Sequence, residues 1–453
     1  MLLCGPAIIA QLASVMLQFI DASMVGSLGS NPAASIGLIA TTTWLFGGFL
    51  FASCQGFSVQ VAHLIGSNDF QGARQVFREA ITSCVSLSVV LALCGLLISP
   101  HLPQWLGGSE EIIRDASRYF FIFCLALPFM QITWLGGTML QCSGNMKLPG
   151  ILDVVMCLLD VIFNFFLIFP TRQIHLLGAD ITVPGAGMGV TGAALGTGIA
   201  MAITAVLMMW FSAVRSPELN IFKERGSFRP KARTLKNAFG ITGPMWLQNA
   251  AMRGAHIAGT IIVAPLGPIA LAANNFAITA EGFCYMPGYG MADAATTLVG
   301  QSLGAARKRL ARSFAKVTIF SGVAMMTFLA IIMFILAPQI MSILSNDPDV
   351  VSMGAYVLRI EAFAETMYAA SIVAYGACIG AGDTIIPSIL NFAGMWIVRI
   401  GLSLWLTRGC GWGLEGYWVP MCIELNLRGI LFLFRIKGDG WMKKNLVSGF
   451  QKT

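Results

Sequence analysis

Apolar segments long enough to cross a lipid bilayer recur about twelve times along this chain of 453 residues. The hydrocarbon core of a bilayer, about 30 Å thick, takes roughly 20 helical residues to span. Twelve such helices use more than half of the chain and leave room only for short loops. Only 11% of the residues are charged, against about 25% in an ordinary soluble protein. We therefore expect an all-α integral membrane protein with twelve transmembrane helices.

The loops between these helices differ in charge. The expected spans are 2–27, 34–64, 80–104, 117–141, 148–170, 188–214, 239–266, 272–302, 316–344, 354–378, 385–406 and 411–435. Twenty of the 28 lysine and arginine residues lie in alternate loops and in the tail that begins at Arg435. By the positive-inside rule, this asymmetry predicts a multi-pass membrane protein with both termini in the cytoplasm. We expect the membrane to be the cell inner membrane. The net charge of +7 therefore indicates orientation, and we expect no nucleic-acid partner.

An internal repeat appears when the chain is aligned with itself at a shift of 238 residues. The shift places Pro6 on Pro244, Leu28-Gly29 on Leu266-Gly267, Gly66 on Gly304, Ala73-Arg74 on Ala311-Arg312, Gly144 on Gly382 and Pro149 on Pro387. Later in each half the shift becomes 224, which pairs Gly189 and Gly192 with Gly413 and Gly416 and places fourteen extra residues in the 170–187 loop. Because each half has an even number of spans, the two repeats are expected to be parallel.

The repeat predicts the domain organisation. We expect an N-terminal six-helix lobe over residues 1–214 and a cytoplasmic linker over 215–238. A C-terminal six-helix lobe over 239–435 and a cytoplasmic tail over 436–453 follow. A substrate cleft between two such lobes, opened alternately to each side of the membrane, is the usual arrangement in transporters built from repeats.

Acids inside the first lobe are the first candidates for function, because an intramembrane charge costs about 3 kcal/mol on insertion scales. Asp21 has no basic residue within a helical turn. Asp153 and Asp160 lie on one face of the fifth span, and Asn164 continues that face. With Asp21 they predict an ion-coupling pocket, although Asp153 near the cytoplasmic end is also typical of a hydrated structural acid. Paired carboxylates favour proton transfer, and the oxygens of Asp21, Asp160 and Asn164 would also bind Na⁺.

Acids in the second lobe are the candidate substrate-binding residues. Glu281 lies in mid-span, where it would either recognise a cation or form a buried ion pair with Arg253 of the neighbouring span. Glu361 and Glu365 are one helical turn apart, and we expect one of them to pair with an arginine of another helix and to leave the other free.

We expect structural roles for the remaining acids of this lobe. We expect Asp293, Glu415 and Glu424 to anchor interfaces or to pair with Arg399 and Arg428.

The sequence gives little indication of an enzymatic site. Gly187-Met188-Gly189-Val190-Thr191-Gly192 matches the spacing of a dinucleotide-binding loop, but it opens a membrane span and follows no strand, so close helix packing explains it better. The four histidines are isolated, the cysteines form no CxxC element, and no Walker lysine motif is present. We therefore expect no enzyme activity, no catalytic residues, no bound metal centre and no cofactor, and we expect an ion gradient as the energy source.

Three stretches resemble the multidrug and toxic compound extrusion (MATE) family. They are Asp21-Ala22-Ser23-Met24-Val25-Gly26-Ser27-Leu28-Gly29, the run from Met286-Pro287-Gly288-Tyr289-Gly290 to Ala294-Ala295-Thr296-Thr297-Leu298-Val299-Gly300-Gln301-Ser302-Leu303-Gly304-Ala305, and Gly187-Met188-Gly189-Val190-Thr191-Gly192-Ala193-Ala194. The resemblance covers essentially the whole chain. It implies a V-shaped pair of lobes, an ion-coupling acid on the first helix, which Asp21 matches, and a polar pair on the fifth helix.

Two details depart from the family pattern. The polar pair is usually Asn followed four residues later by an acid, whereas this chain has Asp160 and then Asn164. In one branch an acid on the seventh helix binds the ion, but here that region reads Ala251-Met252-Arg253. The resemblance therefore favours the branch named for DNA-damage-inducible protein F, which couples through the first lobe.

The resemblance implies an antiporter that exports organic cations or drugs in exchange for H⁺ or Na⁺ by alternating access. The expected partners are small cationic or amphipathic molecules and membrane lipid, and the expected state is a monomer. The alternative on the same fold is a flippase or exporter of a lipid-linked saccharide or another anionic metabolite. That alternative predicts a cationic cleft, whereas acids outnumber bases inside the spans.

Overall fold

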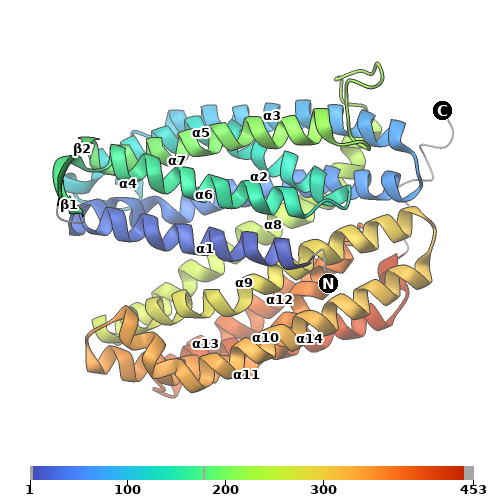
Figure 1. The fold of residues 1–453 in the computed structure, drawn as a ribbon. Coiled ribbons are helices and arrows are strands. Elements are labelled where there is room, and N and C mark those ends of the chain that lie inside the picture. Colours follow the sequence, from blue (N-terminus) through green and yellow to red (C-terminus); the bar gives the residue numbers. More distant parts are fainter. Residues whose placement is uncertain (1–3, 177–178, 443–453) are drawn as a thin grey trace. The chain divides into compact units, whose positions relative to one another are not determined.

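The protein is built from long helices, as the apolar segments predict (Figure 1). The computed structural model describes residues 4–176 and 179–442. The helices of the first half are α1 (Cys4–Gly26), α2 (Ser30–Gly66), α3 (Phe70–Ile98), the short α4 (Leu102–Trp105), α5 (Glu110–Cys142), α6 (Lys147–Leu167) and α7 (Gly189–Trp210), which continues into the π-helical turn η1 (Phe211–Arg215). The first six expected spans coincide with these helices, except that the third, 80–104, runs past the end of α3 into α4. Residues 2–3 of the first expected span lie outside the described residues.

The second half follows the same order. Its elements are α8 (Ala232–Val263), η2 (Ala264–Leu266), α9 (Pro268–Gly304), α10 (Lys308–Leu344), α11 (Pro348–Gly380), α12 (Ile385–Ala393), η3 (Gly394–Ile400), α13 (Gly401–Leu404), η4 (Trp405–Gly409), α14 (Glu415–Lys437) and η5 (Gly440–Met442). The segment from α12 to η4 forms one continuous span with π-helical turns at η3 and η4. Local sequence explains the start of α11, because Asp347 caps the helix and Pro348 occupies its first turn.

Helix bounds and backbone angles confirm the internal repeat. The helices α2, α3 and α5 begin at residues 30, 70 and 110, and α9, α10 and α11 begin at 268, 308 and 348, which is the same shift of 238. Asn68 and Ala306, related by this shift, both have left-handed backbones with φ of 61° and 57°. Gly187 and Gly411, related by the shift of 224, have φ of 63° and 71°. The two halves therefore share turns as well as helices.

A β-hairpin occupies the insertion that distinguishes the first half. Strand β1 (Pro170–Leu176) pairs antiparallel with β2 (Ala179–Ala186), at the left of Figure 1. Arg172 of β1 stacks over the rings of Phe165 and Phe169, at 4.5 Å and 4.0 Å from the ring centroids. The extra residues, expected as a loop, thus form a hairpin that cation–π contacts join to the end of α6.

The chain divides into two compact units. The N-terminal unit comprises Ala13–Val61 and Phe70–Leu235, and the C-terminal unit comprises Met1–Leu12, Ala62–Asp69 and Lys236–Thr453. Each has its own apolar core: Phe120, Leu127 and Leu50 are fully buried in the first, and Trp418 and Leu358 in the second.

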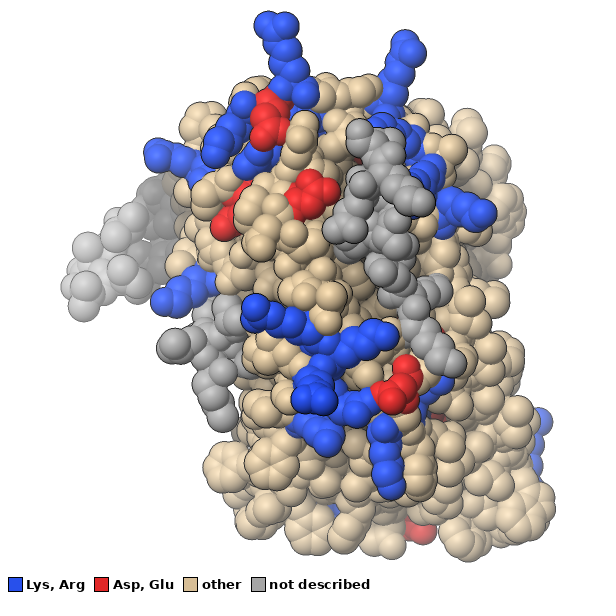
Figure 2. Space-filling model, turned by 90° about the vertical axis from the view of Figure 1, so that its right-hand side faces the viewer, with Lys and Arg blue, Asp and Glu red and all other residues tan. Residues whose placement is uncertain are grey.

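Length and composition suit eight of the described helices to crossing a membrane. The long helices outside this set, α1, α8, α9 and α14, each carry an ionisable residue noted above: Asp21, Arg253, Glu281 and Glu424 respectively. Figure 2 looks onto the end of the molecule where α10 begins and α14 ends, and lysine and arginine side chains gather there. Ionisable residues thus lie on these four helices and also on α6, α11 and η3.

Candidate functional site

In the N-terminal unit, the candidate acids of α1 and α6 meet at the side chain of Asn164. Asp160 and Asn164 are one turn apart on α6, and both are fully buried. The amide nitrogen Nδ2 of Asn164 donates a hydrogen bond to Oδ1 of Asp21 at 2.9 Å and another to Oδ2 of Asp160 at 3.2 Å. One amide therefore bridges an acid from each helix, and we call Asp21, Asp160 and Asn164 the aspartate group.

The aspartate group contains two acceptor oxygens without a donor. Oδ1 of Asp160 and Oδ1 of Asn164 are buried and lack a hydrogen-bond partner in the described part of the chain. Helix α7 approaches this group closely because residue 196 is glycine, and a β-carbon there would collide with Oδ1 of Asn164. Since buried polar atoms normally have partners, the group presents oxygen atoms that a proton or a cation such as Na⁺ would satisfy.

Asp153 stays apart from the aspartate group. It lies two turns before Asp160 on α6 and is half-buried. Among the described residues, no hydrogen bond links it to Asp21, Asp160 or Asn164. The structure therefore brings together three of the four candidate ion-coupling residues and leaves the fourth nearer the start of α6.

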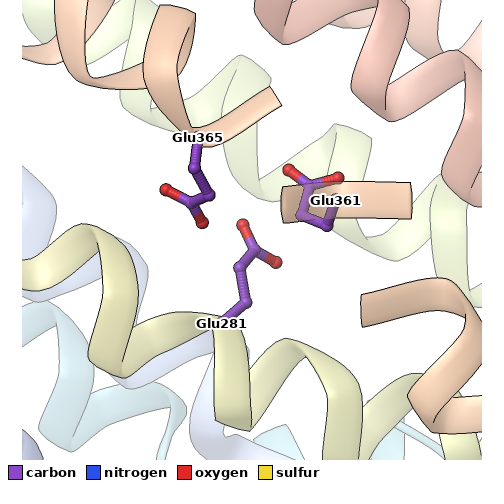
Figure 3. Close-up of side chains that lie close together, drawn as sticks. All are labelled: Glu281, Glu361 and Glu365. Atoms are coloured by element: carbon purple, nitrogen blue, oxygen red, sulfur yellow. The ribbon is translucent and has the colours of Figure 1, made fainter. Parts of the chain in front are cut away.

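In the C-terminal unit, the three candidate substrate-binding acids lie together (Figure 3). Glu281 of α9 faces Glu361 and Glu365 of α11, and one oxygen of each carboxylate lies within 4.8 Å of the other two. Glu361 and Glu365 are completely buried, and Glu281 is 6% exposed. We call these three residues the glutamate cluster.

The carboxylates of Glu361 and Glu365 form no ion pair with another described residue. All four of their oxygens are buried without a hydrogen-bond donor in this part of the chain. The expectation that one of the two pairs with an arginine is therefore wrong. Three carboxylates at this separation in a buried site cannot all stay charged by themselves. Either protons neutralise some of them or a bound cation compensates their charge.

The buried arginines of this unit instead contact Glu424, as the sequence predicts. Nη2 of Arg399 donates to Oε2 of Glu424 at 2.8 Å, and Nε of Arg428 lies 3.3 Å from Oε1 of the same carboxylate. Arg399 lies on η3, where the π-helical turn changes the direction of the side chains that follow. Glu424 thus contacts Arg399 of the neighbouring η3 and Arg428 one turn further along its own helix, α14.

Sequence reasoning missed the aromatic residues beside the glutamate cluster. Tyr285 follows Glu281 by one turn of α9, and Tyr289 follows by two turns. The ring of Tyr285 lies 6.0 Å from that of Tyr289 and 5.7 Å from that of Tyr368 on α11. The spacing of Glu281, Tyr285 and Tyr289 on one helical face could have revealed this set. Tyrosine rings next to carboxylates are suited to organic cations.

Known proteins are similar to this chain over most of its length. A profile of the MatE family matches residues 6–166 and 244–405. A probable multidrug resistance protein NorM of Thermotoga maritima is 21% identical over 98% of this chain and 92% of its own length. The multidrug resistance protein MdtK of Yersinia pestis is 24% identical over 97% of this chain and 94% of its own.

Solved structures agree on the fold. A MATE transporter of Vibrio cholerae superposes with a TM-score of 0.84 at 17% identity, covering 98% of this chain and 96% of that one. The two segments matched by the family profile lie in equivalent parts of the two repeats and together span well over half of the chain. This chain therefore belongs to the MatE family, the multidrug and toxic compound extrusion family.

Proposed function

We propose that this protein is a secondary active antiporter that exports organic cations or drugs in exchange for H⁺ or Na⁺. Its relatives are named multidrug resistance proteins, which supports efflux of small molecules as the activity. In this proposal the lobes 1–214 and 239–435 open alternately to the two sides of the inner membrane. The linker 215–238, the tail 436–453 and both termini are cytoplasmic, because most basic residues lie on that side.

The proposed coupling site is the aspartate group. The observation that carries the proposal is the pair of buried acceptors, Oδ1 of Asp160 and Oδ1 of Asn164, which lack a donor in the described part of the chain. A proton on one of the two carboxylates would supply a donor, and Na⁺ would be coordinated by the same oxygens. Asp153 stays in the proposed coupling set because it lies on the same helix and is half-buried.

The proposed cargo site is the glutamate cluster. Three buried carboxylates with tyrosine rings next to them favour a positively charged, partly aromatic molecule over an anion. An anionic cargo, such as a lipid-linked saccharide, would need basic side chains free to bind it. Arg399 and Arg428 both contact Glu424 instead, so we rank the flippase alternative second.

An efflux assay with Asp21→Asn tests the coupling site. Asparagine keeps the shape of Asp21 but cannot exchange a proton or carry the charge that binds Na⁺. We expect cells expressing the variant to retain a fluorescent organic cation at the level of cells without the transporter, whereas cells expressing the wild type retain much less. Intracellular fluorescence at steady state is the measurement.

Glu110→Gln is the matched control, because Glu110 is an exposed acid in the first turn of α5. We expect this variant to export like the wild type at equal expression. Equal efflux by Asp21→Asn and wild type would overturn the assignment of Asp21, and absence of efflux by the wild type would count against the transporter itself.

A further inference from the structure

A surface groove in the C-terminal unit lies between α10 and α14. Its volume is about 360 Å³. Basic side chains and apolar side chains both line it, chiefly Arg312, Lys316, Lys437, Ile319, Phe320 and Leu433. We call this feature the α10–α14 groove.

The charges and the apolar side chains are ordered along the helices. Arg312 and Lys316 belong to the first turns of α10, and Lys437 is the last residue of α14. Phe320 lies about 12 Å further along α10 than Arg312, at about 1.5 Å of rise per residue. Its side chain is 75% exposed. The groove is thus basic at the helix ends and apolar toward the middle of the span.

The two lysines of the groove, Lys316 and Lys437, form no ion pair with the part of the chain that the structure describes. Arg312 forms an ion pair with Asp439, whose side chain is 76% exposed. Lys316 and Lys437 have no carboxylate partner among residues 4–176 and 179–442. The groove therefore carries uncompensated positive charge at one end.

The internal repeat shows what fills the equivalent place in the N-terminal unit. The shift of 238 pairs Arg74 with Arg312 and Arg78 with Lys316. Arg74 binds the carboxylate of Glu224 at 2.5 Å and the carbonyl oxygen of Glu218 at 3.1 Å. Arg78 donates to the carbonyl oxygens of Ile221 and Glu224.

Both arginines of α3 are therefore buried under residues 218–224. This segment contributes a carboxylate, carbonyl oxygens and an apolar side chain. Ile221 of that segment is only 8% exposed. In the C-terminal unit the chain that follows η5 is residues 443–453, which contain three lysines and no acidic side chain. Residues 443–453 contain no acid equivalent to Glu224, which favours an occupant from outside the protein as the partner of Lys316 and Lys437.

We propose that the α10–α14 groove binds an anionic phospholipid of the leaflet in which the ends of α10 and α14 lie. The phosphate of the headgroup contacts Lys316 and Lys437, and an acyl chain lies along Phe320 and Leu433. The order of charge and apolar surface along the helices matches the order of headgroup and acyl chain in a bilayer. Basic pockets between transmembrane helices are known to select anionic headgroups.

Lipid binding to the purified full-length protein tests this proposal. Native mass spectrometry with phosphatidylglycerol and phosphatidylcholine compares an anionic with a zwitterionic headgroup on the wild type and on the Lys316→Gln/Lys437→Gln variant. We expect the wild type to prefer phosphatidylglycerol. The double variant should bind it about twenty-fivefold more weakly, since each lysine near an anionic headgroup contributes a factor of about five.

Lys308→Gln/Arg309→Gln is the matched control, because both residues are exposed in the first turn of α10, lose the same charge and lie outside the groove. We expect this control to bind phosphatidylglycerol like the wild type. Equal loss of binding in the two double variants, or no preference of the wild type for phosphatidylglycerol, would overturn the proposal. Equally tight binding of soluble glycerol phosphate would show that the groove recognises a free phosphate and no lipid. None of these outcomes depends on the transported molecule.

Discussion

At the scale of single residues, the buried glutamates of this protein differ in whether an arginine compensates their charge. Glu424 is fully buried and contacts Arg399 and Arg428, so its charge is compensated within the protein. Glu361 and Glu365 are equally buried, yet their oxygens have no donor in the described part of the chain. All three are buried glutamates inside long helices. Only the neighbours decide whether a glutamate serves structure or remains open to a ligand.

Removal of the Glu424 charge should destabilise the C-terminal unit. In Glu424→Gln the two arginines would be left buried without a counter-charge, and breaking a buried pair in this way costs about 3 kcal/mol or more. We expect a lower midpoint of thermal unfolding in detergent. Glu415→Gln, which changes an exposed acid in the first turn of the same helix, should leave the midpoint unchanged. A midpoint equal to that of the wild type in Glu424→Gln would contradict the structural role.

At the scale of elements, the contact of α6 with α7 positions the aspartate group. Asn164 bridges Asp21 and Asp160, and at Gly196 α7 approaches α6 so closely that a β-carbon would collide with Oδ1 of Asn164. Two residues later, Gly198 faces Ala126 of α5 at an ordinary packing distance, 3.7 Å from where a β-carbon would stand. A side chain at residue 196 would therefore clash with its neighbour, whereas a small side chain at residue 198 would fit.

Comparison of Gly196→Ala with Gly198→Ala tests whether the close approach at Gly196 matters for efflux and stability. We expect Gly196→Ala to displace Asn164 and to reduce efflux, with a loss of stability of about 1–3 kcal/mol from overpacking. Gly198→Ala should be close to neutral in both respects. Efflux of a fluorescent cation and thermal unfolding of the purified variants are the measurements. Equal behaviour of the two variants would argue against the close approach at Gly196.

At the scale of the whole molecule, the two candidate sites belong to different compact units. The aspartate group lies in the N-terminal unit and the glutamate cluster in the C-terminal unit. The proposed function assigns ion coupling to the first and cargo binding to the second. Substitutions in the two units should therefore affect transport in different ways.

Transport in proteoliposomes under an imposed pH gradient, and separately under a sodium gradient, measures this difference. We expect the wild type to respond to one of the two gradients and Asp160→Asn to respond to neither. Glu365→Gln should keep the gradient response but raise the KM for an organic cation about tenfold, because one charged contact is lost. Loss of the gradient response in Glu365→Gln, with unchanged KM, would contradict the division of roles.

The sequence alone determined the helices, the repeat and the candidate residues. Span length, loop charge and recurring glycines depend on local chemistry and chain order, so twelve spans and a shift of 238 could be predicted. The pairing of Glu424 with Arg399 and Arg428 was also predictable, because an intramembrane charge needs a partner.

Which acids meet depends on how the helices pack against one another. Asn164 bridges Asp160, which spacing on α6 places beside it, and Asp21, which lies 143 residues away. Glu281 meets Glu361 and Glu365 because α9 packs against α11. The 170–187 segment, predicted as a loop, forms a β-hairpin. Helical periodicity specifies the face of a residue but not the helix that will cover that face. The buried oxygens left without donors, on which the proposed function rests, arise from that packing.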